Sequence, residues 1–146
     1  MISREDLESF LIRMDMEWEE VGEGMFVLRG ENDGPPVVVQ HADPVLLLRL
    51  KVMDLPEAEG REAFYRSLLE FNATDIVHGA YGIEDKELIL SDTLELATLD
   101  FEELQASVES LLYAVSSHLS KIRDMVGAGD SEAGNSETGE EAEAEG

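Results

Sequence analysis

Two segments of the chain alternate apolar and polar residues, which is the two-residue period of a β-strand with one buried face. The first is Val45–Met53, where an apolar residue at every second position alternates with Arg49 and Lys51. The second is Glu87–Ala97, where leucines alternate with polar residues and Asp92 interrupts the apolar face. Both segments are predicted to be strands with one face in the core. The two cations on the other face are expected to pair with carboxylates of neighbouring strands.

Apolar residues at steps of three and four between Phe101 and Val126 predict one long helix. Asp100 is placed to cap the first free amides of this helix, with Glu103 three residues later as in a capping box. Gly127 follows as the residue that ends the helix. Such a long apolar stripe needs a partner, so we expect the helix to pack on the sheet that contains the alternating strands.

The rest of the chain supplies two shorter helices and the remaining strands, separated by turns rich in glycine and proline at 22–24, 30–36 and 41–44. The helices are predicted at Ser3–Met14 and Pro56–Phe71, and the strands at Trp18–Val21, Met25–Arg29, Val37–Gln40 and Ile76–Ile83. With residues 37–53 counted as one strand that the turn at 41–44 interrupts, the predicted order is helix, three strands, helix, two strands, helix. This order indicates an α+β fold with a twisted antiparallel sheet and helices packed on it.

The last twenty residues differ in composition from the rest of the chain. Residues 127–146 contain seven acidic residues, no basic residue and no large apolar residue. Such a segment buries too little apolar surface to offset the entropy of ordering it. We therefore predict a single domain at residues 1–126, followed by a disordered acidic tail at 127–146.

The chain is strongly acidic, with 34 acidic and 10 basic residues and a formal net charge of -24. Negative charge disfavours nucleic acid and anionic membranes and favours a basic partner, although acidity also serves solubility alone. No apolar run has membrane-spanning length, and residues 1–10 lack the apolar stretch of a signal peptide. We expect a cytoplasmic protein that binds neither nucleic acid nor membrane.

No residue pattern predicts catalysis, a metal or a cofactor. The chain has no cysteine, and no two of its three histidines have the spacing of metal ligands. Its serines and glycines form neither a nucleophile motif nor a phosphate loop. Asp92 is better explained by a bulge, or by pairing with a strand cation, than by a functional site. We expect a protein without enzymatic activity; an acidic cleft that binds a divalent cation is the remaining enzymatic hypothesis.

The segment AYGIEDKELILSDTLELATLDFEELQASVESLLYAVSSHL joins a leucine-rich strand to a helix that begins after Thr-Leu-Asp. With the order of elements, this segment resembles the Tir-chaperone (CesT-like) superfamily, which comprises class I type III secretion chaperones and the related YbjN-type domains. The resemblance implies a homodimer that holds an extended segment of a partner protein along apolar patches without ATP. A YbjN-type regulatory or adaptor domain without secretion clients is the alternative, and the loop at 30–36 and the acidic tail leave a diverged role open.

Two sets of apolar residues are the candidate binding surfaces. The resemblance implies that the middle helix and an adjoining strand form the dimer interface, which points to Phe64, Tyr65, Leu68, Leu69 and Phe71. The candidates for binding the partner segment lie in the first helix and the first strands, and are Phe10, Met14, Trp18, Met25 and Val27. Burial in the protein's own core is the competing interpretation for both sets.

Overall fold

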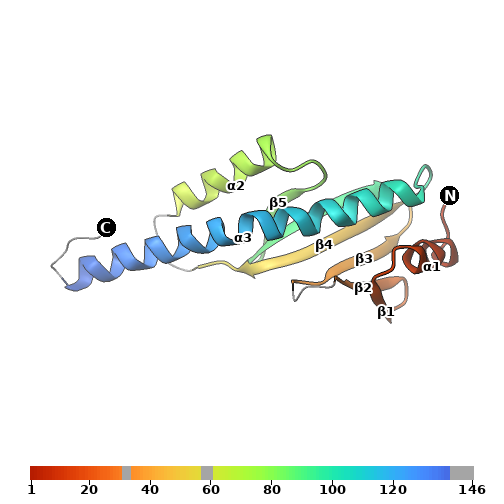
Figure 1. Cartoon of the computed structure of the whole chain (residues 1–146), viewed down its shortest axis with the longest axis horizontal. Coiled ribbons are helices and arrows are strands. Elements are labelled where there is room, and N and C mark those ends of the chain that lie inside the picture. Colours follow the sequence, from red (N-terminus) through yellow and green to blue (C-terminus); the bar gives the residue numbers. More distant parts are fainter. Residues whose placement is uncertain (31–33, 57–60, 139–146) are drawn as a thin grey trace.

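The computed structural model describes residues 1–30, 34–56 and 61–138, with side chains up to Val126; the predicted loop at 30–36 falls partly outside these ranges. Within them, six strands form one antiparallel sheet, and the helices pack on one face of that sheet (Figure 1). The elements in chain order are α1 (Arg4–Arg13), β1 (Glu17–Gly22), β2 (Met25–Arg29), β3 (Val37–Ala42), β4 (Val45–Asp54), α2 (Glu62–Thr74), β5 (Ala80–Glu84), β6 (Glu87–Glu95) and α3 (Phe101–Thr138).

The strands follow the spatial order β1-β2-β3-β4-β6-β5, so β1 and β5 form the two edges of the sheet. All neighbouring pairs are antiparallel, and the predicted α+β class is confirmed. In the described part of the chain, four strands precede α2, one more than in the predicted order. The difference arises because the turn at 43–44 separates β3 and β4 into two complete strands.

The two faces of β4 are divided as its alternation predicts. The leucines at every second position are buried under the helices, whereas Arg49 and Lys51 are exposed on the opposite face. Arg49 Nη1 donates to both carboxylate oxygens of Glu84 on β5, at 2.8 and 2.9 Å. Lys51 Nζ lies 3.2 Å from a carboxylate oxygen of Glu87 on β6. The predicted pairing of these cations with carboxylates of other strands is therefore confirmed.

α3 runs along the sheet and buries its predicted apolar stripe (Figure 1). Its predicted cap is confirmed, because the Glu103 N–H donates to Asp100 Oδ1 at 2.7 Å. The helix does not end at Gly127 but continues to Thr138. A glycine inside a helix costs about 1 kcal/mol relative to alanine, and it ends a helix only in a left-handed conformation. The predicted domain boundary at residue 126 thus falls inside α3, and residues 139–146 of the predicted disordered tail lie outside the described residues.

The middle helix and the strand after it are both shifted along the chain from their predicted positions. α2 begins and ends later than the predicted Pro56–Phe71, and residues 57–60 lie outside the described part. The helix does not end at Phe71 but continues through Asn72, whose side chain hydrogen-bonds to the backbone of Tyr81. β5 begins later than the predicted Ile76–Ile83, because Gly79 turns the chain with φ of +91°.

Asp92 packs against α3 and not against a strand cation. Its Oδ2 atom accepts a hydrogen bond of 2.7 Å from the hydroxyl of Ser107, a buried residue of α3. Asp92 also lies in regular register with Leu48, and the irregularity between β4 and β6 falls elsewhere, between Lys51 and Met53. Both predicted explanations, a bulge and an ion pair, are therefore wrong. The aspartate satisfies a buried hydroxyl at the junction of helix and sheet.

Candidate functional site

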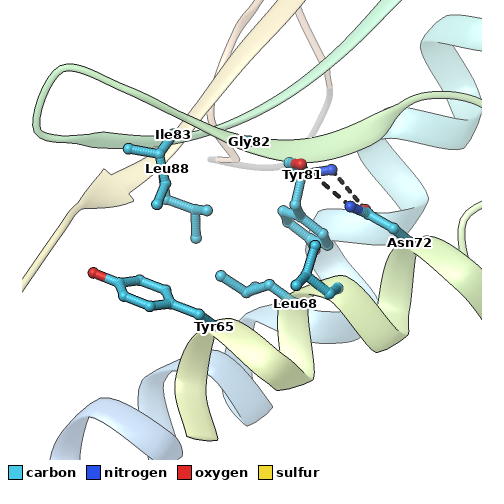
Figure 2. Close-up of a pocket in the computed structure, with 8 residues that line it drawn as sticks. Tyr65, Leu68, Asn72, Tyr81, Gly82, Ile83 and Leu88 are labelled. Carbon is cyan, nitrogen blue, oxygen red and sulfur yellow. Dashed lines mark hydrogen bonds between the residues drawn. The ribbon is translucent and has the colours of Figure 1, made fainter. Parts of the chain in front are cut away.

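An apolar pocket of about 370 Å³ lies between α2 and the β5 edge of the sheet (Figure 2). Figure 2 shows Tyr65 and Leu68 of α2 extending toward Leu88 and Ile83 on the strands. None of the residues that line the pocket carries a charge. They are Tyr65, Leu68, Leu69 and Asn72 of α2, Tyr81, Gly82 and Ile83 of β5, and Leu88 of β6.

Exposed and buried apolar side chains meet in this pocket. Leu68 and Leu88 are buried and belong to the core, whereas Leu69 is 67% exposed and Ile83 is 53% exposed. Covering an aliphatic side chain of this size stabilises a complex by about 1.5–3 kcal/mol relative to leaving it in water. Two such side chains beside an uncharged hollow are typical of a surface that binds another protein.

Asn72 fixes α2 against the edge strand. Its side-chain Oδ1 accepts the Tyr81 N–H at 2.7 Å, and its Nδ2 donates to the Tyr81 carbonyl at 3.2 Å (Figure 2). A carboxamide offers the same donor and acceptor as a peptide group, so Asn72 takes the place that a neighbouring strand would take. No sequence pattern indicates this pairing, because asparagine next to an apolar helix is ordinarily typical of a helix end.

A series of hydrogen bonds that runs from buried Tyr81 through buried His118 to exposed Asp75 holds the same junction. The Tyr81 hydroxyl lies 2.9 Å from His118 Nδ1, and His118 Nε2 lies 3.0 Å from Asp75 Oδ2. The His118 ring is 4% exposed and stacks on Phe71, with 4.0 Å between the ring centroids. These hydrogen bonds therefore connect β5, α3 and the C-terminal end of α2.

The protonation states of its two ends constrain this series of hydrogen bonds. Burial raises the pKa of Tyr81 well above its ordinary value, so the hydroxyl that faces His118 Nδ1 keeps its proton. His118 Nε2 donates to Asp75 Oδ2, because an ionised carboxylate can only accept. This hydrogen bond, with a second one from Thr74, holds the pKa of Asp75 below its ordinary value.

The five predicted dimer residues are divided between the core and the pocket. Phe64 and Leu68 are buried in the protein's own core, and Phe71 lies against His118. Tyr65 and Leu69 line the pocket, and Leu69 is the most exposed of the five. Leu68 also contributes to the pocket, as part of its inner wall.

The structure does not bring the five predicted partner-binding residues together. Phe10 packs on Phe101 of α3 and Met14 is buried, so both support the core. Trp18 is half-buried and packs edge-on against Phe26, under the helices. The remaining two, Met25 and Val27, are half-buried on the sheet face that carries no helix.

Two residues of this helix-free face were missed in the sequence. Val38 and Leu47 are half-buried, and with Met25, Gln40 and Arg49 they line a hollow of about 190 Å³. The available signal was the continuous apolar run in β3 and again in β4. Such runs are typical of strands that are covered on both faces.

The sequence comparison assigns this fold to a family. The CesT_Tir_1 family matches residues 2–128 of the chain. The chain belongs to the CesT_Tir_1 family. The resemblance to the Tir-chaperone (CesT-like) superfamily that residues 80–119 carry is thereby confirmed. Among curated proteins, none matches the sequence of this CesT_Tir_1 protein.

Solved structures share the fold of the CesT_Tir_1 chain at low sequence identity. A chain of the ExoU–SpcU heterodimeric complex from the type III secretion system of Pseudomonas aeruginosa has a TM-score of 0.62 and 15% identity, over 75% of this chain and 92% of that chain. YbjN from E. coli has a TM-score of 0.60 and 16% identity, over 82% and 93%. The Yersinia pestis complex of the type III secretion chaperone SycH with a stable fragment of YscM2 has a TM-score of 0.56 and 16% identity, over 76% and 94%.

Neither a metal site nor a membrane-spanning helix is found among the described residues of the CesT_Tir_1 chain. In residues 1–30, 34–56 and 61–126, no group of three or more histidines, aspartates and glutamates is arranged to hold a metal ion. Within the part of the chain that the structure describes, no helix combines the length and the apolar character needed to cross a membrane.

Proposed function

We propose that this CesT_Tir_1 protein is a non-catalytic protein-binding module that acts as a homodimer and holds an extended segment of a partner protein. Its fold is similar to that of SycH, a type III secretion chaperone solved in complex with a fragment of YscM2. The observation that carries the proposal is the uncharged α2–β5 pocket with exposed Leu69 and Ile83 on the surface of a chain with net charge -24. Uncharged surface in so acidic a protein is where a second macromolecule avoids repulsion.

The α2–β5 pocket is the proposed dimer interface. Two copies of an acidic chain repel each other, so their contact must exclude carboxylates, and the residues that line this pocket carry no charge. A two-fold interface also requires a surface that is complementary to itself. Leu69 and Ile83 project beside a hollow that is wide enough to receive an aliphatic side chain from the other copy.

Leu69→Glu is expected to convert a dimer into a monomer. The substitution would bury two unpaired carboxylates across a two-fold axis, which costs several kcal/mol, so the dimer dissociation constant should rise by about 100-fold or more. Sedimentation equilibrium of both proteins measures this change. Ile12→Glu is the matched control, because Ile12 on α1 is also 67% exposed but lies outside the pocket. A wild-type protein that is monomeric at high concentration, or a dimer that only Ile12→Glu weakens, would contradict the proposed interface.

The helix-free face of the sheet is the proposed surface for the partner segment. Val27 of β2 lies opposite Val38 of β3, and both are half-buried at the centre of this face. Toward the β1 edge, Glu19 lies opposite Val27 and Glu17 lies opposite Arg29, and all four line the same hollow of about 250 Å³. An apolar centre bordered by charges of both signs favours an extended segment that combines apolar side chains with polar ones.

Capture of partners from the native lysate, followed by mass spectrometry, tests this surface and separates the two candidate functions. We expect Val38→Glu to abolish recovery of a protein that the wild type captures, because the new charge lies at the apolar centre. Thr93→Glu is the control, since Thr93 is exposed on the same face outside that centre. A secreted effector as the captured protein supports the chaperone function. A regulatory component supports the alternative, a YbjN-type adaptor, which the similarity to YbjN over 82% of this chain favours. Equal capture by both variants would exclude this face.

A further inference from the structure

The two edges of the sheet differ in what surrounds their backbone. In an antiparallel edge strand, every second residue directs its N–H and C=O away from the sheet, where an additional strand would pair with them. On β5 those outward groups belong to Tyr81, because both of its backbone groups hydrogen-bond to Asn72 of α2. The next residue with outward groups is Ile83, two positions along the strand.

We propose that Asn72 closes the β5 edge to strand addition, so that the α2–β5 surface receives apolar side chains from α2 of a second copy and not a β-strand. This inference rests on the homodimer proposed above. An incoming strand must pair with consecutive outward residues, and at Tyr81 it would have to displace a carboxamide held by bonds of 2.7 and 3.2 Å. With the position at Tyr81 occupied, β5 offers a new strand too short a ladder to pair with.

The side-chain geometry supports a helical contact. Tyr65 and Leu69 lie four residues apart on α2, so they share one face of the helix, and both line the pocket. On the same helix, Arg66 pairs with Glu70 at 3.1 Å, and neither of these charged residues lines the pocket. Two copies related by a two-fold axis would therefore bring the Leu69 side chains of both α2 helices to the same contact.

The chain has no cysteine, so single cysteines report which contact forms. Gly82→Cys marks the centre of β5, where a Cβ atom has open space and where two paired β5 strands would bring the cysteines within disulfide reach. Leu69→Cys marks the α2 face. In the dimer of the Leu69→Cys variant, we expect a short bis-maleimide to cross-link the cysteines of the two copies. In the dimer of the Gly82→Cys variant, we expect no disulfide between the copies. Addition of Asn72→Ala to Gly82→Cys should allow that disulfide to form. A Gly82→Cys disulfide in the presence of Asn72, no link at Leu69→Cys, or no disulfide after Asn72→Ala would each overturn the proposal.

Amide exchange provides a measurement that does not depend on dimerisation. In the Leu69→Glu variant, the Tyr81 amide should exchange slowly and the Ile83 amide quickly, because only Tyr81 has a side-chain acceptor outside the sheet. Asn72→Ala in the same background should speed exchange of the Tyr81 amide by about tenfold, the effect of one lost hydrogen bond. Equal exchange of the two amides would show that the edge is open. A monomeric wild-type protein would contradict the dimer while these exchange rates still decide whether Asn72 closes the edge.

Discussion

Gly79→Ala is expected to lower the free energy of unfolding by about 2–5 kcal/mol, the sum of left-handed strain and overpacking. Gly79 has a φ of +91°, and a Cβ atom added there would lie 2.6 Å from the Ser91 carbonyl oxygen and 2.8 Å from Leu111 Cδ2. The Ser91 carbonyl cannot easily move away, because β6 pairs with strands on both sides at this residue. Urea unfolding followed by circular dichroism measures the loss.

Gly82→Ala is the matched control for this prediction. Gly82 lies three residues later in β5, and a Cβ atom added there meets nothing within 4 Å. Its substitution is expected to change the free energy of unfolding by no more than about 0.5 kcal/mol, as for other unhindered surface positions. If the two alanine variants unfold at the same urea concentration, the close approach of Gly79 to β6 and α3 does not determine the stability of this junction.

Much of the fold follows from local patterns in the sequence. The alternating leucines of β4 and the apolar stripe of α3 are buried as predicted, because each pattern reports the period of its own element. The first helix begins where the sequence indicates, with Ser3 and Asp6 in a reciprocal capping box. These features involve residues within four positions of each other, which is the range over which sequence determines backbone geometry directly.

The interactions that escaped prediction join residues far apart in the chain. Ser107 and Asp92 are fifteen positions apart, and Tyr81 and His118 are thirty-seven apart. Such pairs depend on the position of α3 along the sheet and on its rotation about its own axis. No local periodicity in the sequence reveals either of these. The contact of Asn72 escapes prediction for the same reason, since its partner Tyr81 belongs to the following strand. Polar residues inside apolar elements thus marked tertiary contacts here, not element ends.

The candidate dimer residues were predicted on the correct helix but without its orientation. Phe64, Leu68 and Phe71 follow one helical stripe, and Tyr65 and Leu69 follow the adjacent one. Both stripes are apolar, so the sequence could not determine which one packs on the sheet. The fold resolves this choice, because Phe64 and Leu68 of the first stripe are buried in the core, with Leu68 also forming the inner wall of the pocket, whereas Leu69 of the second stripe is exposed beside it.

Replacement of His118 by phenylalanine is expected to destabilise the protein by about 2–3 kcal/mol, the cost of leaving a buried hydroxyl without its partner plus a small change in packing. Phenylalanine keeps the stack on Phe71 but loses both hydrogen bonds, to Tyr81 and to Asp75. Tyr81→Phe in the same background should recover part of the loss, since it removes the unsatisfied hydroxyl. The control is Tyr113→Phe, because Tyr113 is 74% exposed and its hydroxyl is free to bond to water. Additive effects of the two substitutions would contradict a shared hydrogen bond.

The pH dependence of stability provides an independent test of the same chain of hydrogen bonds. Because the hydrogen bond from His118 lowers the folded pKa of Asp75, its contribution is present above the ordinary value of 3.8 and is lost as pH falls through the lowered value. The pKa shift of Tyr81 makes stability change with pH in the opposite direction. Its folded pKa is raised, so the stability linked to its protonated form is present below the ordinary value of 10.0 and declines above it. The difference in unfolding free energy between the wild type and His118→Phe should therefore be larger above about pH 4 than below it, where Asp75 gains a proton. Urea midpoints of both proteins between about pH 3 and pH 8 measure this difference. If the difference in unfolding free energy between the two proteins stays constant down to about pH 3, Asp75 and His118 do not interact in the folded protein.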